Sequence, residues 1–80
     1  MNLYAEATRI SSEVIQYIWK KVDSYDCQVN RTIRTAEILI GITIRGIRYE
    51  FMGVLTQEDD PEALIQVMRN EIEKIINEIK

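Results

Sequence analysis

The chain has no histidine, and this absence removes the side chain that most often transfers protons near neutral pH. It also removes zinc fingers and most transition-metal sites, because these depend on imidazole ligands. Cys27 is the only cysteine, so an intrachain disulfide cannot form, and a thiol nucleophile would have no histidine base beside it. We therefore expect no enzymatic activity, no cofactor and no metal site, and we expect Cys27 to pack as a small apolar residue in the core or at an edge.

Proline occurs once and glycine three times in the 80 residues, and no tract of low complexity is present. A composition of 46% apolar and 29% charged residues is typical of an ordered globule. The longest apolar run, residues 38–44, is too short to cross a bilayer, and the N-terminus lacks the basic and apolar regions of a secretory signal. Together with the single thiol, these features predict a cytoplasmic protein of one domain, residues 1–80.

Charge is uneven along the chain, whose net charge is −3. Residues 27–56 carry four arginines against two acids, whereas residues 57–80 carry seven acids against three bases. The arginines of the middle segment could serve nucleic-acid binding, which is the alternative function: they are Arg31, Arg34, Arg45 and Arg48. The overall acidic balance disfavours that function, because it depends on neutralising phosphates.

Two segments show the three- and four-residue spacing of amphipathic helices. In the first, apolar residues recur over positions 3–22, Asn2 can cap the N-terminus, and residues 23–26 follow as an exit loop. In the second, Asp60 and Pro61 form a helix start, and an apolar stripe continues to the C-terminus.

Between the helices the apolar period changes to two, in a segment rich in β-branched and aromatic residues. A hairpin turn at Arg45-Gly46 places Ile44 opposite Ile47 and continues to match residues of the same face along residues 36–55. A shift of this register by one residue would destroy the match, so the pattern predicts the register strongly.

A further strand is expected over residues 27–34, where apolar and polar residues alternate. A tight turn at Arg34-Thr35 would put Val29 opposite Ile40 and extend the apolar face. Neither turn residue favours positive φ, so the alternative is a longer or irregular connection. In this arrangement Arg31 would point to the core side, which is acceptable only at the edge of the sheet.

The sheet has one strongly apolar face, and both helices carry apolar stripes of similar length. The expected fold class is therefore α+β: a two-layer sandwich in the order helix–strand–strand–strand–helix (αβββα), with both helices on one face of a three-stranded antiparallel sheet. This order of elements resembles the double-stranded-RNA-binding fold. Those domains carry lysines at the start of the second helix, where this chain has acids at positions 58–60 and 62, so we assign no family.

The second face of the sheet should be left to water, but its centre is predicted to be apolar. Three apolar residues meet there, within a charged rim: the centre is Leu39, Met52 and Val54, and the rim is Glu37, Arg48 and Glu50. An apolar centre with a charged rim is the anatomy of a protein interface. Two of the rim residues, Glu37 and Glu50, are on the order of 13 Å apart in this register, too far to share a proton or a metal ion.

We expect first a non-catalytic interaction protein that self-associates through this face, most simply as a two-fold dimer, and acts by occupying or bridging a partner protein. Its size and acidity suit an inhibitor, an adaptor or a phage accessory factor of the anti-defence kind. The alternatives are nucleic-acid binding by the arginines named above, and a small structural subunit of a larger complex. In the last case the extra contact would fall on the same face or on an edge strand.

Overall fold

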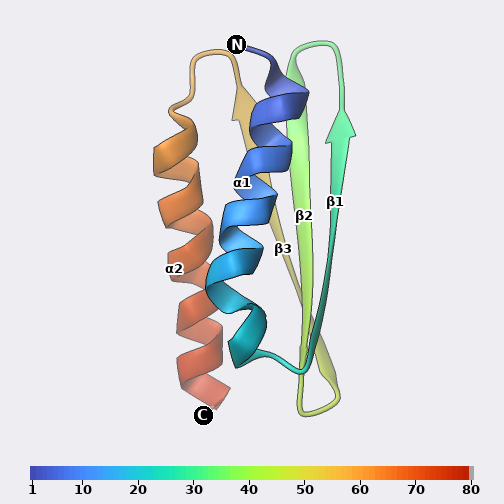
Figure 1. The fold of residues 1–80 in the computed structure, drawn as a ribbon, viewed down its shortest axis with the longest axis vertical. Coiled ribbons are helices and arrows are strands. Elements are labelled where there is room, and N and C mark those ends of the chain that lie inside the picture. Colours follow the sequence, from blue (N-terminus) through green and yellow to red (C-terminus); the bar gives the residue numbers. More distant parts are fainter. Residues whose placement is uncertain (80) are drawn as a thin grey trace.

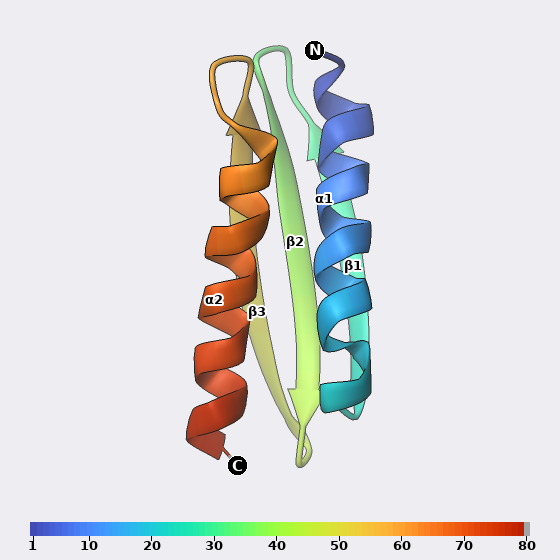
Figure 2. The same ribbon diagram turned by 60° about the vertical axis from the view of Figure 1, so that its left-hand side comes forward.

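The computed structural model describes residues 1–79 as a three-stranded antiparallel sheet with two helices on one of its faces (Figure 1). The elements, in chain order, are α1 (Leu3–Ile18), the 3-10 turn η1 (Trp19–Lys21), β1 (Ser24–Arg31), β2 (Thr35–Ile44), β3 (Ile47–Thr56) and α2 (Pro61–Ile79). Strand β2 lies between β1 and β3. Helix α1 covers β1 and β2, whereas α2 covers β3 (Figure 2), which confirms the predicted αβββα arrangement.

Local sequence signals determine where both helices begin. The Asn2 side chain accepts a hydrogen bond from the Ala5 backbone N–H at 3.0 Å, and Asp60 accepts one from the Glu62 backbone N–H at 3.0 Å. Pro61 occupies the first position of α2, where a missing N–H costs no helical hydrogen bond. The first helix ends earlier than predicted, because its last residues before position 22 continue as η1.

The β2–β3 hairpin has the register that the isoleucine pattern predicts, with Ile44 opposite Ile47 and Ile38 opposite Gly53. The turn residues Arg45 and Gly46 have φ angles of 54° and 79°. This left-handed pair of conformations is what a two-residue turn between twisted strands requires.

The hydrophobic core lies between the helices and the inner face of the sheet. Its central members are Ile10, Val14 and Ile18 of α1, Ile38, Ile40 and Ile42 of β2, Leu55 of β3, and Met68, Ile72 and Ile76 of α2. A Cβ atom built on Gly53 would lie 2.7 Å from the Met68 sulfur. Helix α2 therefore packs close to β3 because position 53 has no side chain.

Polar contacts join the outer sides of the two helices. They are Arg9 to Glu62 at 2.9 Å, Lys21 to Glu73 at 3.0 Å, and the Arg69 guanidinium stacked 3.7 Å from the centre of the Tyr17 ring. These contacts mark the side of α1 that faces α2.

The first strand differs from the prediction in both its limits and its register. It begins and ends three residues earlier than residues 27–34, and residues 24–26, expected in a loop, pair with β2. Val29 lies opposite Ile38 rather than Ile40. The two-residue turn predicted at Arg34-Thr35 is therefore wrong, and the alternative, an irregular connection, is what the structure has.

The reason lies in the connection between β1 and β2, which threonine side chains hold closed. The Thr32 backbone N–H donates to the Thr35 carbonyl at 2.9 Å, and the Thr35 N–H donates to the Thr32 hydroxyl at 3.0 Å. Hydroxyl groups thereby form a turn that needs no glycine. Ile33, which falls within the strand predicted over residues 27–34, instead lies at the tip of this connection and is 99% exposed.

Cys27 lies on β1 opposite Ile40, on the helix side of the sheet, and is exposed. The prediction that Cys27 packs in the core is wrong, whereas the alternative, a position at an edge of the sheet, agrees with the structure. Arg31 also lies on the helix side, opposite the buried Ala36, and is exposed. Both side chains reach water because β1 is an edge strand and no element of residues 1–79 lies beyond it.

Candidate functional site

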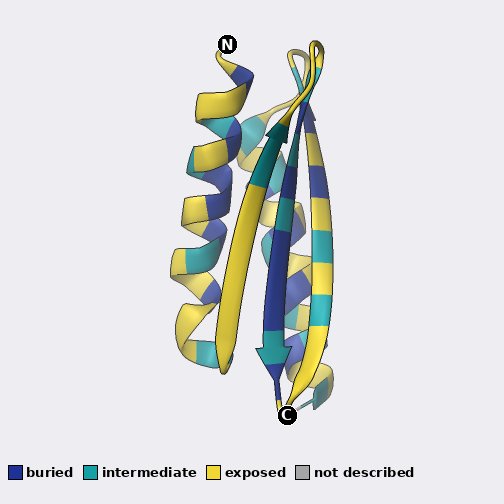
Figure 3. Ribbon diagram, turned by 90° about the vertical axis from the view of Figure 1, so that its right-hand side faces the viewer, coloured by how far each residue is buried: buried dark blue, intermediate teal, exposed yellow. Residues whose placement is uncertain are grey.

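The face of the sheet opposite the helices is left uncovered by the described part of the chain, as Figure 3 shows with β1 in the foreground. At its centre Leu39 of β2 lies opposite Met52 of β3, and Glu37 lies opposite Val54. Met52 is 57% and Val54 42% exposed, and Leu39 is half-buried. The residues of the predicted apolar centre therefore do lie side by side on this open face.

Arg48 of the rim is hydrogen-bonded to two carboxylates. Its guanidinium donates to both carboxylate oxygens of Asp26, at 2.6 and 3.1 Å, and its Nε donates to Glu50 at 3.1 Å. The hydrogen bond from Arg48 lowers the pKa of Asp26, and the Asp26 and Glu50 carboxylates raise the pKa of Arg48. To reach β1 the arginine crosses Gly41, where a Cβ would lie 2.6 Å from its Cζ atom.

Asp26 is the charged residue of the open face that the sequence prediction missed, because it was expected in a loop. The available signal was Gly41 itself, a glycine inside the central strand, which indicates that another group approaches the backbone closely. With Asp26 included, the open face carries three acids and one base: Asp26, Glu37 and Glu50 against Arg48, a net charge of −2.

The four arginines predicted for nucleic-acid binding do not meet. Arg34 lies in the β1–β2 connection and Arg45 in the hairpin turn, at opposite ends of a ten-residue strand that is about 30 Å long. Arg31 lies on the helix side, and Arg48 is already paired with carboxylates. Two tyrosines could stack on bases: Tyr49 is half-buried against the core, whereas Tyr25 on β1 is 48% exposed.

Two of the acidic residues before α2, Asp59 and Asp60, bond to the local backbone. Asp59 accepts hydrogen bonds from the backbone N–H and the hydroxyl of Thr56, at 2.8 and 3.0 Å, and Asp60 caps the helix. Within residues 1–79, no three carboxylate or thiol side chains are grouped so that they could hold a metal ion. No helix in the same range combines the length and the apolar character needed to cross a membrane.

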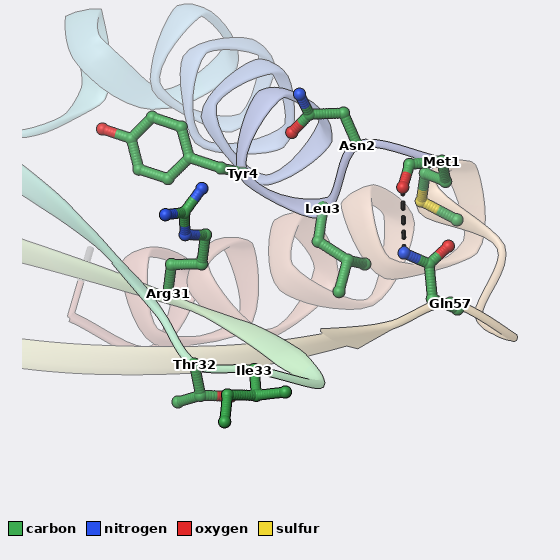
Figure 4. A pocket seen from close by; sticks show the side chains of 8 residues that line it. All are labelled: Met1, Asn2, Leu3, Tyr4, Arg31, Thr32, Ile33 and Gln57. Carbon is green, nitrogen blue, oxygen red and sulfur yellow. Dashed lines mark hydrogen bonds between the residues drawn. The ribbon is translucent and has the colours of Figure 1, made fainter.

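A hollow of about 720 Å³ lies at the end of the molecule where the chain starts (Figure 4). The Gln57 side chain donates to the Met1 carbonyl at 2.9 Å along its wall. Its lining is Met1, Asn2, Leu3, Tyr4, Arg31, Thr32, Ile33 and Gln57. This set includes no carboxylate and no thiol.

The comparisons with known proteins add no relative. No protein-family model matches the chain, and neither a curated protein nor a solved structure matches it.

Proposed function

We propose that the chain is a non-catalytic protein-interaction module that binds a partner protein through the open face of its sheet. The observation that carries this proposal is the Leu39–Met52 pair at the centre of an uncovered face, with Val54 beside it. Single exposed apolar side chains are ordinary on protein surfaces. A contiguous patch inside a charged rim is less ordinary and favours an interface.

The charges of the rim indicate the chemistry of the partner. With a net charge of −2, the face complements a surface that has an apolar centre and lysine or arginine side chains around it. A second copy of the same face would bring like charges together, which disfavours the self-association expected through this face and favours a different protein as the partner. Such a module acts by occupying or bridging its partner, as an inhibitor or an adaptor does.

The exposed Cys27 thiol supports a further part of the proposal, which concerns location. An exposed and unpaired thiol suits a reducing compartment, and we place the protein in the cytoplasm.

Affinity purification from the native host tests the role of the open face, with three tagged baits: wild type, Met52→Glu and Val67→Glu. Met52 and Val67 are 57% and 51% exposed, so a charge at either position leaves the core intact, but Val67 lies on α2, away from the open face. We expect a partner protein that co-purifies with wild type and with Val67→Glu but not with Met52→Glu. With that protein purified, Met52→Glu should raise its Kd at least about tenfold. Equal Kd values for all three baits would show that the open face is not the binding surface.

A further inference from the structure

Strand β1 leaves one edge of the sheet unpaired, and Figure 3 shows it exposed along most of its length. The Thr32 N–H donates to the Thr35 carbonyl, so by the alternation of an antiparallel ladder the even-numbered residues of β1 bond to β2. The odd-numbered residues Tyr25, Cys27 and Val29 therefore direct their backbone N–H and C=O groups to the free edge. Of the usual protections of an edge strand, residues 24–31 have only charge, at Asp26, which is paired with Arg48, and at Arg31. They contain no lysine and no proline, and they pair with β2 without a bulge.

The side of α1 next to this edge is uncharged. Arg9 and Lys21 bond to α2, so the opposite side of α1 faces the β1 edge. At three- and four-residue spacing that side consists of Tyr4, Thr8, Ser11, Ser12, Ile15 and Trp19. Tyr4 and Trp19 are each 48% exposed. Figure 4 shows Tyr4 and Arg31 lining the same hollow, so the Tyr4 end of this side lies at the end of β1.

We propose that this β1 flank, formed by the free edge of β1 and the uncharged side of α1, binds a second copy of the chain. The two sheets would join in a two-fold dimer as one six-stranded antiparallel sheet. Strands lie about 4.8 Å apart, and α1 covers β1 and β2, so the two α1 helices would be two strand spacings apart, about 9.6 Å. Helices pack at about 8–10 Å, so strand pairing and helix packing occur together without rearrangement.

The side chains of β1 select one register for the joined strands. With Cys27 opposite Cys27 of the second copy, Tyr25 lies opposite Val29, which is a favourable aromatic and β-branched pair. Asp26 then lies opposite Gln28. A shift by two residues in one direction would place Asp26 opposite its own copy, and a shift in the other direction would break the Tyr25–Val29 pair. The register with Cys27 on the two-fold axis is therefore preferred.

The two-fold axis through Cys27 also allows the two α1 helices to pack against each other. Cys27 is four residues from Arg31, about 13 Å along the strand, and this distance corresponds to about nine residues of helix. Tyr4 lies level with Arg31, so the two-fold axis passes α1 near Ser12. The side chains there are small enough for the two helices to approach closely. It also brings Tyr4 of one copy toward Trp19 of the other. The aromatic side chains then pack at the two ends of the helix pair.

Charge and area both support a second copy as the occupant of the β1 flank. The two charged residues of β1, Asp26 and Arg31, have opposite signs, whereas the open face carries a net charge of −2 and would repel its own copy. An interface formed by the eight-residue strand β1 and the helix α1 above it buries on the order of 600 Å² of each copy. This area is at the lower end of the range for specific protein interfaces. We therefore expect a dimer with a micromolar Kd. The open faces stay free in this dimer, so the inference does not rest on the proposed partner binding.

Light scattering after gel filtration, from low to high micromolar concentration, tests the dimer. Wild type should reach twice the mass of a 9.4 kDa chain. Cys27→Lys places two ammonium groups opposite each other at the axis and should weaken dimerisation at least about tenfold. Because Cys27 is exposed, the Cys27→Lys variant should fold and keep the far-UV circular dichroism spectrum of wild type. Cys27→Ser and Met52→Glu should remain dimeric. A monomeric wild type, or a dimer that Met52→Glu dissociates and Cys27→Lys does not, would overturn the proposal.

Cross-linking tests the register. Directly opposed, hydrogen-bonded residues have Cα atoms about 5.5 Å apart, within the range of a disulfide. Copper(II)–phenanthroline should therefore convert wild type rapidly to a covalent dimer: two copper(II) ions accept the two electrons released when the two thiols form a disulfide, and the two protons pass to water. The control Cys27→Ser/Gln16→Cys moves the thiol to an exposed position of α1 that faces neither β1 nor α2, and it should react slowly. Equal rates for the two proteins would refute the β1–β1 pairing.

Discussion

Arg48 on β3 reaches across the central strand and forms a two-point ion pair with Asp26 on β1, at 2.6 and 3.1 Å. The path is open because the residue between them, on β2, is Gly41. One side chain thereby links all three strands on the open face, between residues 22 positions apart in the sequence.

Gly41→Ala should separate this pair. The new Cβ would occupy the space of the Arg48 guanidinium, and the arginine can move away because its end is flexible and exposed. The pKa of Asp26, lowered by the hydrogen bond from Arg48, should then rise toward its ordinary value. An NMR titration of the Asp26 carboxyl group measures the change. Glu37→Gln, on the same face but without a contact to Arg48, serves as the control and should leave that pKa where it is in wild type.

The same ion pair predicts a pH dependence of stability. A carboxyl group whose pKa is lower in the folded than in the unfolded chain contributes stability above the unfolded pKa and loses it as the pH falls through the folded pKa. At low salt, wild type should therefore have a higher urea midpoint than Asp26→Asn at neutral pH. The difference should disappear in strong acid. A difference that is constant over the whole range would contradict this origin.

Arg45→Asn should stabilise the hairpin by about 0.5–1 kcal/mol, because asparagine tolerates positive φ better than arginine and Asn-Gly is a preferred two-residue turn. Arg45 has a φ of 54°, and its backbone N–H donates to Asp23 at 2.8 Å, a bond that the substitution retains. Arg45→Val should instead destabilise the protein, since a β-branched residue is strained at positive φ. Urea unfolding of the three proteins gives the order, and a stabilising valine would disprove the explanation.

Gly53→Ala should reduce the free energy of unfolding by about 1–3 kcal/mol through overpacking. Its Cβ would lie 2.7 Å from the sulfur of Met68, which is almost fully buried. In the background of Met68→Ala the space is free, so the same substitution should cost less. Chemical denaturation of wild type, Gly53→Ala, Met68→Ala and the double variant measures this difference in the free energy of unfolding. If the losses of unfolding free energy in the two single variants sum to the loss in the double variant, Met68 of α2 does not crowd position 53.

Ile38→Ala and Met52→Ala test which face of the sheet is inward. Ile38 is fully buried beneath the helices, and its truncation should reduce the free energy of unfolding by about 2–5 kcal/mol. Met52 is 57% exposed on the open face, and its truncation should change that energy by less than about 0.5 kcal/mol. Similar losses for the two variants would place Met52 inside the protomer.

Most of the fold was predictable from short-range patterns. Asn2, Asp60 and Pro61 mark helix starts by interactions within a few residues of the chain. The Arg45-Gly46 turn sets the β2–β3 register, because alternation with a period of two allows only one match of the apolar residues. From this register the sequence also predicted which side chains of β2 and β3 lie on the open face.

Tertiary structure decided what depends on the edge of the sheet. The sequence by itself determined the elements and the inner face, because propensity and periodicity act locally. It did not determine the limits of β1, since these depend on a turn held by threonine hydroxyls rather than by glycine. The place of Asp26 beside Arg48 and the exposure of Cys27 follow from those limits, because both arise from contacts, or missing contacts, between strands distant in the chain.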